Sequence, residues 1–267
     1  MIKLDEIIAA KKEEVDARRS LKTVEILEEA ASKQRKTVSL KNILASGNRT
    51  GIIAEFKPAS PSRGVINAEA DVEKVTADYV KMGAEALSVL TDNRFFGGSF
   101  QNLEKARKIN NCPILQKDFI LDEYQLLEAR SFGADVILLI AAVLNREKVE
   151  RLAHKAHCLG MEVILEVHKE DELDMLVEDV DIVGVNNRDL STFKTNIETS
   201  LLMADMIPGN FVKISESGIN DAKTIIRLRK AGFSGFLIGE YFMQHKDPAK
   251  ALGHLVADLE KLSIGKK

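Results

Sequence analysis

The feature that most constrains this fold is a repeat of short apolar segments rich in residues that favour β-strands. Eight such segments occur along the 267 residues, and most are followed by an amphipathic stretch with helical spacing. In one such stretch Val72, Val75 and Tyr79 fall on a single helical face. Several stretches end in a glycine, which is typical of the left-handed residue that closes a helix. The eight segments are residues 51–57, 85–91, 113–119, 135–143, 161–167, 181–186, 211–217 and 235–239.

Strict alternation of strands and helices predicts right-handed βαβ units and a parallel sheet. The segments are apolar almost throughout, which indicates that both faces of the sheet are covered. A doubly wound open sheet is the alternative architecture, but it normally carries a glycine-rich dinucleotide-binding turn after an early strand. Here that turn, residues 57–62, reads Lys-Pro-Ala-Ser-Pro-Ser. We therefore predict an α/β fold in which eight units close into a (β/α)8 TIM barrel.

The first 47 residues stand outside this pattern and are predicted to form two or three amphipathic helices. The candidate helices are Ile2–Arg18, Val24–Ser32 and Leu40–Ala45. They could cover the N-terminal mouth of the barrel or form a flap beside an active site, and the pattern favours neither. Because no linker or second-domain boundary is visible, we predict a single domain over residues 1–267, with residues 1–47 as an N-terminal helical extension.

Charged and polar residues occur where buried strands should be apolar. Glu55 and Lys57 are two residues apart in the first segment, so they point to the same side of the sheet. The others are Lys117 in the third segment, Glu166 in the fifth, Asn186 and Arg188 at and after the end of the sixth, and Glu216 in the seventh. Any one of them could be an ion pair at a strand end. Because several strands bring such groups to the same C-terminal mouth, where barrels place their active sites, we favour an active site.

The last two segments carry the signature expected of a phosphate site. In barrels of this kind, phosphate is commonly held by the loops after strands seven and eight, through backbone N–H groups. Ser217 ends the seventh segment and Gly218 follows it, while Gly239 ends the eighth and Glu240 follows it. Small residues let the backbone approach phosphate oxygens, so the sequence predicts a phosphorylated substrate.

Composition excludes several other classes of protein. The net charge of −3 provides no electrostatic footprint for nucleic acid or an anionic membrane. The longest apolar run, Val136–Leu144, is nine residues and too short to cross a bilayer. Two unpaired cysteines, together with a first segment that does not resemble a signal peptide, favour the cytoplasm. His154, His157 and Cys158 have helical spacing, but an exposed helix face explains them better than a metal site does.

The motifs resemble those of the indole-3-glycerol phosphate synthase family. The matching stretches are IIAEFKPASPSRG (52–64), LSVLTDNRFFGGS (87–99), PILQKDFI (113–120), GADVILLIAA (133–142), VGVNNRDL (183–190), ESGI (216–219) and FLIGE (236–240). The resemblance covers essentially the whole chain, including the N-terminal helices. The chain departs from the expected pattern at Tyr241 and Phe242, where a small residue and a leucine are usual.

The resemblance implies that 1-(2-carboxyphenylamino)-1-deoxyribulose 5-phosphate is converted into indole-3-glycerol phosphate, with loss of CO₂ and water. It further implies that Lys117 is the general acid at the ketone oxygen, that Glu166 is its base partner, and that Glu55 and Lys57 assist proton transfer and carboxylate binding. The substrate-binding residues that it implies are Ser60, Phe96, Asn186, Arg188, Ser217, Gly218, Gly239 and Glu240. No metal and no organic cofactor is implied. The expected partner is a phosphorylated small molecule, with neither nucleic acid nor membrane, and a monomer is sufficient for this role.

Two other functions fit the same residues. One is a different phosphate-binding barrel enzyme, such as a sugar-phosphate isomerase or an aldolase that forms a Schiff base through Lys57 or Lys117. The other is a non-catalytic sensor of phosphorylated metabolites. The sensor is disfavoured because binding phosphate does not require two internal lysines and two internal glutamates.

Overall fold

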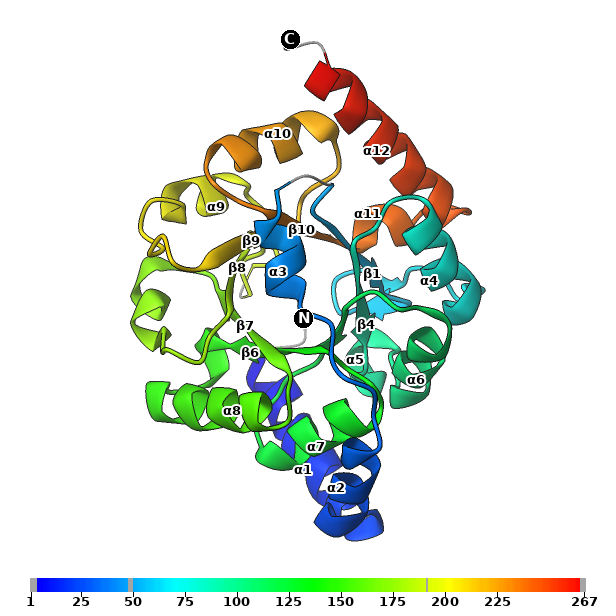
Figure 1. Cartoon of the computed structure of the whole chain (residues 1–267), viewed down its shortest axis with the longest axis vertical. Coiled ribbons are helices and arrows are strands. Elements are labelled where there is room, and N and C mark those ends of the chain that lie inside the picture. The colour runs from blue at the N-terminus through cyan, green and yellow to red at the C-terminus, as the bar shows by residue number, and fades with distance from the viewer. Residues whose placement is uncertain (1–3, 48–49, 191, 265–267) are drawn as a thin grey trace.

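The computed structural model describes residues 4–47, 50–190 and 192–264. Eight parallel strands form a closed barrel in the order β1-β10-β9-β8-β7-β6-β5-β4, with helices around the outside (Figure 1). The strands are β1 (Ile52–Phe56), β4 (Ala86–Leu90), β5 (Ile114–Lys117), β6 (Val136–Ile140), β7 (Glu162–Val167), β8 (Ile182–Asn186), β9 (Val212–Glu216) and β10 (Gly235–Ile238). Each lies within one of the eight predicted segments, so the predicted TIM barrel is confirmed.

The outer layer is formed by helices that follow the strands. These are α4 (Val72–Lys81), α6 (Phe100–Ile109), α7 (Glu123–Ser131), α8 (Arg146–Cys158), α9 (Glu198–Met203), α10 (Ala222–Lys230) and α12 (Pro248–Ile264). A 3₁₀ helix, η2 (Glu170–Met175), takes this position after β7, and another, η1 (Ala141–Val143), follows β6. Shorter elements at the strand ends are α5 (Asn93–Phe96), α11 (Glu240–Met243) and a hairpin of β2 (Ala59–Ser60) and β3 (Gly64–Val65). None of the helices within the described ranges is long and apolar enough to cross a membrane.

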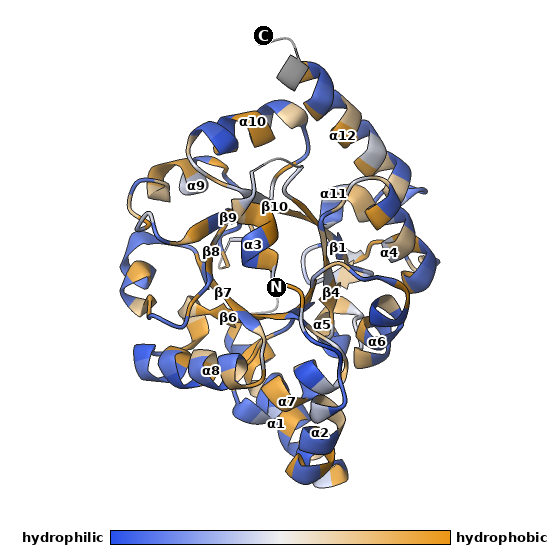
Figure 2. Ribbon diagram, viewed as in Figure 1, coloured by the Kyte–Doolittle hydropathy of each residue, from blue (hydrophilic) through white to orange (hydrophobic). Residues whose placement is uncertain are grey.

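Alternation along the strands separates two apolar cores. Ile52, Ala54 and Phe56 of β1 pack against the surrounding helices, whereas Ile53 and Glu55 face the barrel interior. The strands are accordingly apolar, while the helices are hydrophilic on their outward sides (Figure 2). Because every second residue of a strand points inward, any polar residue near its C-terminal end at that spacing enters the mouth of the barrel.

The N-terminal extension folds as α1 (Leu4–Leu21), α2 (Val24–Ser32) and α3 (Leu40–Ala45). The second and third helices match their predicted bounds, and the first extends beyond the predicted Arg18. Ile2, where we predicted its start, lies outside the described residues. The extension begins on one side of the barrel, where α1 and α2 pack on α7, and ends with α3 over the centre of the barrel (Figure 1).

Both of the locations proposed for the extension are occupied, but by different helices. Leu40 and Leu44 of α3 are buried in the core inside the barrel, at its N-terminal mouth. Glu162, the first residue of β7, accepts a hydrogen bond from the backbone N–H of Lys41 at 2.9 Å and holds α3 there. Helix α1 instead reaches the opposite mouth, where Leu4 and Ile7 line the cavity described below.

Candidate active site

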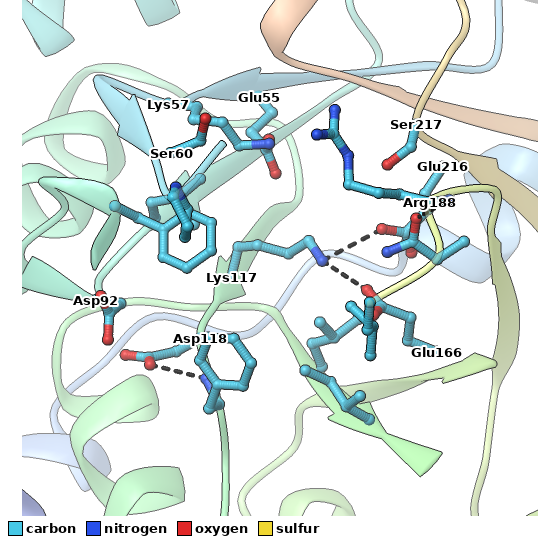
Figure 3. Close-up of a pocket in the computed structure, with 18 of the residues that line it drawn as sticks. Glu55, Lys57, Ser60, Asp92, Lys117, Asp118, Glu166, Arg188, Glu216 and Ser217 are labelled. Carbon is cyan, nitrogen blue, oxygen red and sulfur yellow. Dashed lines mark hydrogen bonds and ion pairs between the residues drawn. The ribbon is translucent and has the colours of Figure 1, made fainter. Parts of the chain in front are cut away.

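Lys117 lies at the centre of the C-terminal mouth (Figure 3). It ends β5, and its Nζ lies 2.7 Å from Oε2 of Glu166 and 3.3 Å from Oε2 of Glu216. Glu166 comes from β7 and Glu216 from β9, so three strands bring one ammonium and two carboxylates together. Both glutamates are buried and Lys117 is nearly so.

The charges in this group are set by burial and by one another. Burial alone would lower the pKa of Lys117, but the carboxylates of Glu166, Glu216 and Glu55 outweigh it and raise this pKa above its ordinary value. Burial and the neighbouring carboxylates raise the pKa of Glu216 to about 7. Burial would also raise the pKa of Glu166, but Lys117 and His168 lower it below its ordinary value. At neutral pH the site therefore contains an ammonium, an ionised carboxylate and a second carboxyl group that readily gains or loses a proton.

A second ion pair forms at the end of β1. Nζ of Lys57, which follows the strand, lies 2.6 Å from Oε1 of Glu55, so the two side chains lie on the same side of the sheet, as their spacing predicted. Glu55 also accepts a hydrogen bond from Oγ of Ser88 on β4 at 3.2 Å. A Cβ atom on Gly239 would overlap the Glu55 carboxylate. The position of Glu55 therefore requires a glycine at residue 239. This reason differs from the one inferred from the sequence, which was close approach of the backbone to phosphate.

Arg188, which follows β8, closes one side of the pocket. Its Nη2 lies 2.8 Å from Oε2 of Glu240, and its Nη1 donates a hydrogen bond to Oγ of Ser62 at 3.0 Å. Glu240 also pairs with Arg63, whose Nε lies 3.0 Å from Oε1. The hairpin after β1 is thereby tied to the loops after β8 and β10. Asn186 orients this turn, because its Oδ1 accepts a hydrogen bond from the backbone N–H of Arg188 at 3.0 Å.

The main cavity has an apolar wall beside Lys117. The rings of Phe96 on α5 and Phe119 after β5 lie 6.1 Å apart, centroid to centroid. The other apolar residues in this cavity are Leu4, Ile7, Leu90, Leu138, Ile140, Leu190, Phe193 and Leu237. This wall adjoins the charged groups at the C-terminal ends of β1, β5, β7 and β9.

A second, more polar cavity adjoins the first and shares Lys57 and Arg188 with it. Backbone from the loops after β9 and β10 forms its floor, including Gly218 and Gly239. Ser217 and Gly218 both adopt left-handed φ angles, 67° and 76°. Such a conformation is costly for a residue other than glycine, and strained residues of this kind often occur at functional sites.

All of the residues predicted from the sequence for this site lie in the walls of these two cavities. Ten line the main cavity, namely Glu55, Lys57, Ser60, Phe96, Lys117, Glu166, Asn186, Arg188, Ser217 and Glu240. Gly218 and Gly239 line only the second. The departure from the family pattern after Glu240 is accommodated locally: Tyr241 lines the second cavity, while Phe242 is buried against Tyr79 with ring centroids 5.7 Å apart.

Some site residues were missed by reasoning from the sequence. From the sequence, Glu216 is only one of the strand-end charges, and its role as a partner of Lys117 was not predicted. Lys11 of α1 is 1% exposed and lies 2.8 Å from Asp92 and 2.9 Å from Asp118. Both aspartates line the main cavity. A lysine on an amphipathic helix carries no signal of such burial, because the partners are about 80 to 110 positions away in the chain.

The histidines and cysteine set aside in the sequence lie on the surface of α8. His154 pairs with Asp179 at 3.1 Å, and His157 pairs with Asp181 at 2.8 Å. Among the described residues, no group of three or more His, Cys, Asp or Glu side chains is arranged to hold a metal ion.

Comparison with known proteins identifies close relatives by sequence. Residues 4–255 match the family model described as indole-3-glycerol phosphate synthase. A relative of that name from Bacteroides thetaiotaomicron is 47% identical over 257 residues, covering 96% of this chain and 98% of the relative. Another of that name, from Burkholderia vietnamiensis, is 42% identical over 255 residues, covering 94% of this chain and 98% of the relative.

Solved structures resemble the chain in fold at much lower identity. 3-Hexulose-6-phosphate synthase from Salmonella typhimurium has a TM-score of 0.63 at 13% identity, covering 79% of this chain and 99% of that one. The alpha subunit of tryptophan synthase from Legionella pneumophila has a TM-score of 0.60 at 14% identity, covering 84% and 97%. At such low identities, these similarities show only that the chain shares the barrel fold with these proteins.

Proposed function

This chain belongs to the indole-3-glycerol phosphate synthase family, and from that premise we propose the reaction that it catalyses and the role of each group in the pocket. The protein converts 1-(2-carboxyphenylamino)-1-deoxyribulose 5-phosphate into indole-3-glycerol phosphate. A carbon of the aromatic ring attacks the ketone, CO₂ leaves from that carbon, and water leaves from the former ketone. The product serves tryptophan biosynthesis.

The two cavities suggest how the substrate lies. Its aromatic ring occupies the apolar wall beside Phe96 and Phe119. Its phosphate occupies the polar cavity formed by the loops after β9 and β10, which include Gly218 and Gly239. The ketone, which lies between these ends of the substrate, then falls near Lys117 in the main cavity.

Lys117 acts as the general acid. Attack on the ketone places negative charge on its oxygen, and a positioned ammonium stabilises that charge and supplies a proton. Glu166 and Glu216 favour the protonated form of Lys117, which suits an acid. A Schiff-base nucleophile would instead have to be largely neutral. The ion pairs therefore support acid catalysis over the aldolase alternative.

The remaining groups serve carboxylate binding and proton transfer. Lys57 is placed to hold the substrate carboxylate before CO₂ leaves, with Glu55 orienting its ammonium at 2.6 Å. The ionised Glu166 takes the proton that must be removed to complete the indole. Glu216, with a pKa of about 7, supplies a proton to the departing hydroxyl group or accepts one between steps.

Lysine and glutamate side chains can perform every step of this scheme, so we propose that the protein works without a metal or organic cofactor. Cys112 and Cys158 are free thiols. Free thiols are compatible with a reducing compartment, and we propose the cytoplasm as the location. We further propose that a monomer is sufficient for catalysis. Nucleic acid has no part in the scheme.

The observation that carries this proposal is the single ammonium of Lys117 held between two buried carboxylates beside an apolar wall. The direct experiment is to incubate the purified protein with the carboxyphenylamino-deoxyribulose phosphate and to follow indole fluorescence and CO₂ release together. Equal amounts of both products are expected. Failure to form indole at any substrate concentration would contradict the proposal.

A further inference from the structure

His168 occupies a position behind the catalytic group that the scheme above leaves unexplained. It lies two residues after Glu166 and follows the end of β7. Its Nε2 lies 3.4 Å from Oε1 of Glu166, the carboxylate whose other oxygen faces Lys117. On its other side, Nδ1 lies 3.5 Å from Oε2 of Glu172 on η2. The imidazole is about 10% exposed and lines neither cavity, so it does not touch substrate.

The buried charges require an additional cation at this point. Glu55, Glu166 and Glu216 are buried carboxylates that line the main cavity, and the buried carboxylate of Glu172 lies behind them, beside His168. Two ammonium groups, Lys57 and Lys117, face them. Among these groups the carboxylates outnumber the ammonium groups, and an unpaired buried charge costs several kcal/mol. A protonated His168 and a proton held by Glu216 each reduce this excess of negative charge.

We propose that His168 is a positioning residue that, as an imidazolium, keeps the Glu166 carboxylate ionised and directed at Lys117, so that the exchangeable proton of the cluster resides on Glu216. This inference rests on the proposed function, because it explains which of two similar carboxylates is the base. Glu166 and Glu216 both contact Lys117, but only Glu166 is also paired with His168.

The surroundings of the imidazole favour its charged form. The acidic groups that face it are Glu166 on β7, Glu172 on η2 and, farther away, Glu216 on β9. The ammonium of Lys117 contacts the other oxygen of Glu166, Oε2, at 2.7 Å. The 3₁₀ helix η1, which packs on β7 and η2, consists of Ala-Ala-Val and therefore adds no charged group near the imidazole. Arg146 of α8 donates instead to the backbone carbonyl of Leu176 at 2.8 Å.

Burial alone would lower the pKa of His168, but the carboxylates of Glu172 and Glu166 outweigh it and raise the pKa above its ordinary value. Glu172 is itself fixed by the backbone N–H of His168, which donates to its Oε2 at 2.6 Å. The turn after β7 therefore fixes this second carboxylate next to the imidazole.

The kinetic test is the pH dependence of kcat/KM for His168→Gln. Glutamine retains polarity without the positive charge, so the pKa of Glu166 should rise. The acidic limb of the profile should move to higher pH by about one unit, the usual effect of losing one nearby charge. At any pH on the acidic limb, kcat/KM of the variant should be about tenfold lower than that of the wild type, because a rise of one unit in this pKa lowers the ionised fraction of the base about tenfold. KM should change little because His168 does not line the cavities.

His154→Gln is the matched control, since it makes the same replacement at an exposed histidine that pairs with Asp179. Its profile should match that of the wild type. If His168→Gln lowers thermal stability but leaves the acidic limb in place, His168 only supports the turn and the proposal is wrong. If the wild-type protein does not turn the substrate over, the proposed function fails, and the charge of His168 must be judged by the measurement below.

That measurement is an NMR titration of the histidine rings in the wild-type protein, which needs neither substrate nor a folded variant at His168. The chain has five histidines, and replacement of His168 or of the others assigns its signal. We expect His168 to remain protonated at pH values where exposed histidines have lost their proton. Glu172→Gln should lower its midpoint. A ring that is neutral at pH 6 would overturn the proposal.

Discussion

At the scale of single residues, the chemistry depends on which groups carry a proton at neutral pH. If Lys117 were buried among apolar residues alone, burial would favour its neutral form. Two carboxylates within 3.3 Å reverse that tendency. The same carboxylates are unequal, because one of them also faces an imidazole. At this scale, function depends on how the charged groups are arranged around Lys117 and not on any single residue.

The protonated state of Lys117 makes a chemical prediction. A neutral lysine that attacked the ketone would form a Schiff base, which borohydride reduces to a stable secondary amine. We expect borohydride with substrate to leave the wild-type protein unmodified and active. Intact mass spectrometry checks this outcome, with the same treatment of Lys117→Met as the control. A substrate-sized increase in mass that maps to Lys117 would favour an aldolase-like function.

Glu216 should introduce a basic limb into the pH profile. Its raised pKa of about 7 means that the carboxyl group is protonated below that pH and loses its proton above it. If the scheme requires the protonated form, kcat/KM should decline as pH rises through about 7. Glu216→Gln cannot ionise, so the variant should be slower but without this limb. A wild-type profile that is flat between pH 6 and pH 8 would contradict the role given to Glu216.

At the scale of elements, the strands and most helices were predictable because their apolar residues recur with clear periods. The C-terminal position of Lys117 and Glu166 was predictable for the same reason: a charge at the end of a parallel strand has only one mouth to enter. The sequence could not predict which carboxylate contacts which lysine, because partners such as Glu166 and Glu216 come from different strands. The 3₁₀ helix η2 also lacks a period long enough to recognise in sequence.

Glycine at the turn after β9 provides a test of the phosphate cavity. Gly218 has a φ of 76°, and a Cβ there would overlap Thr195. Gly218→Val should therefore distort this turn and mainly raise KM, since phosphate is gripped alike in the ground and transition states. The measurement is the steady-state kinetics of this variant. The control is Gly160→Val, because Gly160 has a similar φ of 77° but lies away from the site, so the comparison separates an effect on substrate binding from general backbone strain.

Sulfate and inorganic phosphate complete that test, because either should compete with substrate for the cavity. If neither ion competes and Gly218→Val binds substrate normally, the phosphate does not occupy this position.

Gly239 is expected to behave differently, although it lies in the adjacent turn. A Cβ atom there would displace the Glu55 carboxylate from Lys57. Gly239→Ala should consequently lower kcat more than it raises KM, by disturbing proton transfer and carboxylate binding. Gly209→Ala, where added atoms meet open space, is the control and should be silent in kinetics. An unchanged kcat in Gly239→Ala would mean that the position of Glu55 is unimportant.

At the scale of the whole molecule, the N-terminal extension joins both mouths of the barrel. Its three helices were predictable, but their destinations were not, because amphipathic patterns indicate that a face is buried without indicating where. Helix α3 fills the N-terminal mouth through Leu44, while Lys11 fixes α1 to Asp92 and Asp118 at the catalytic mouth. We propose on this basis that residues 1–267 act as a single domain.

The two attachments should separate in experiments. Deletion of residues 1–45 should reduce both stability and substrate affinity. Leu44→Ala should lower the free energy of unfolding by about 2–5 kcal/mol with little change in kinetics. Lys11→Met leaves two buried carboxylates unpaired in the cavity wall and should raise KM as well. Denaturant titrations and steady-state kinetics check these effects, and a deletion that lost only stability would mean that the extension is purely structural.

The central claim is that the ammonium of Lys117 protonates the ketone oxygen, and the kcat of Lys117→Met at saturating substrate tests it most directly. Methionine retains most of the bulk of the side chain but supplies no proton. We predict that kcat for indole formation falls by about two to four orders of magnitude, the usual contribution of general acid catalysis, while substrate affinity changes much less. A variant that forms indole at nearly the wild-type rate would contradict the account.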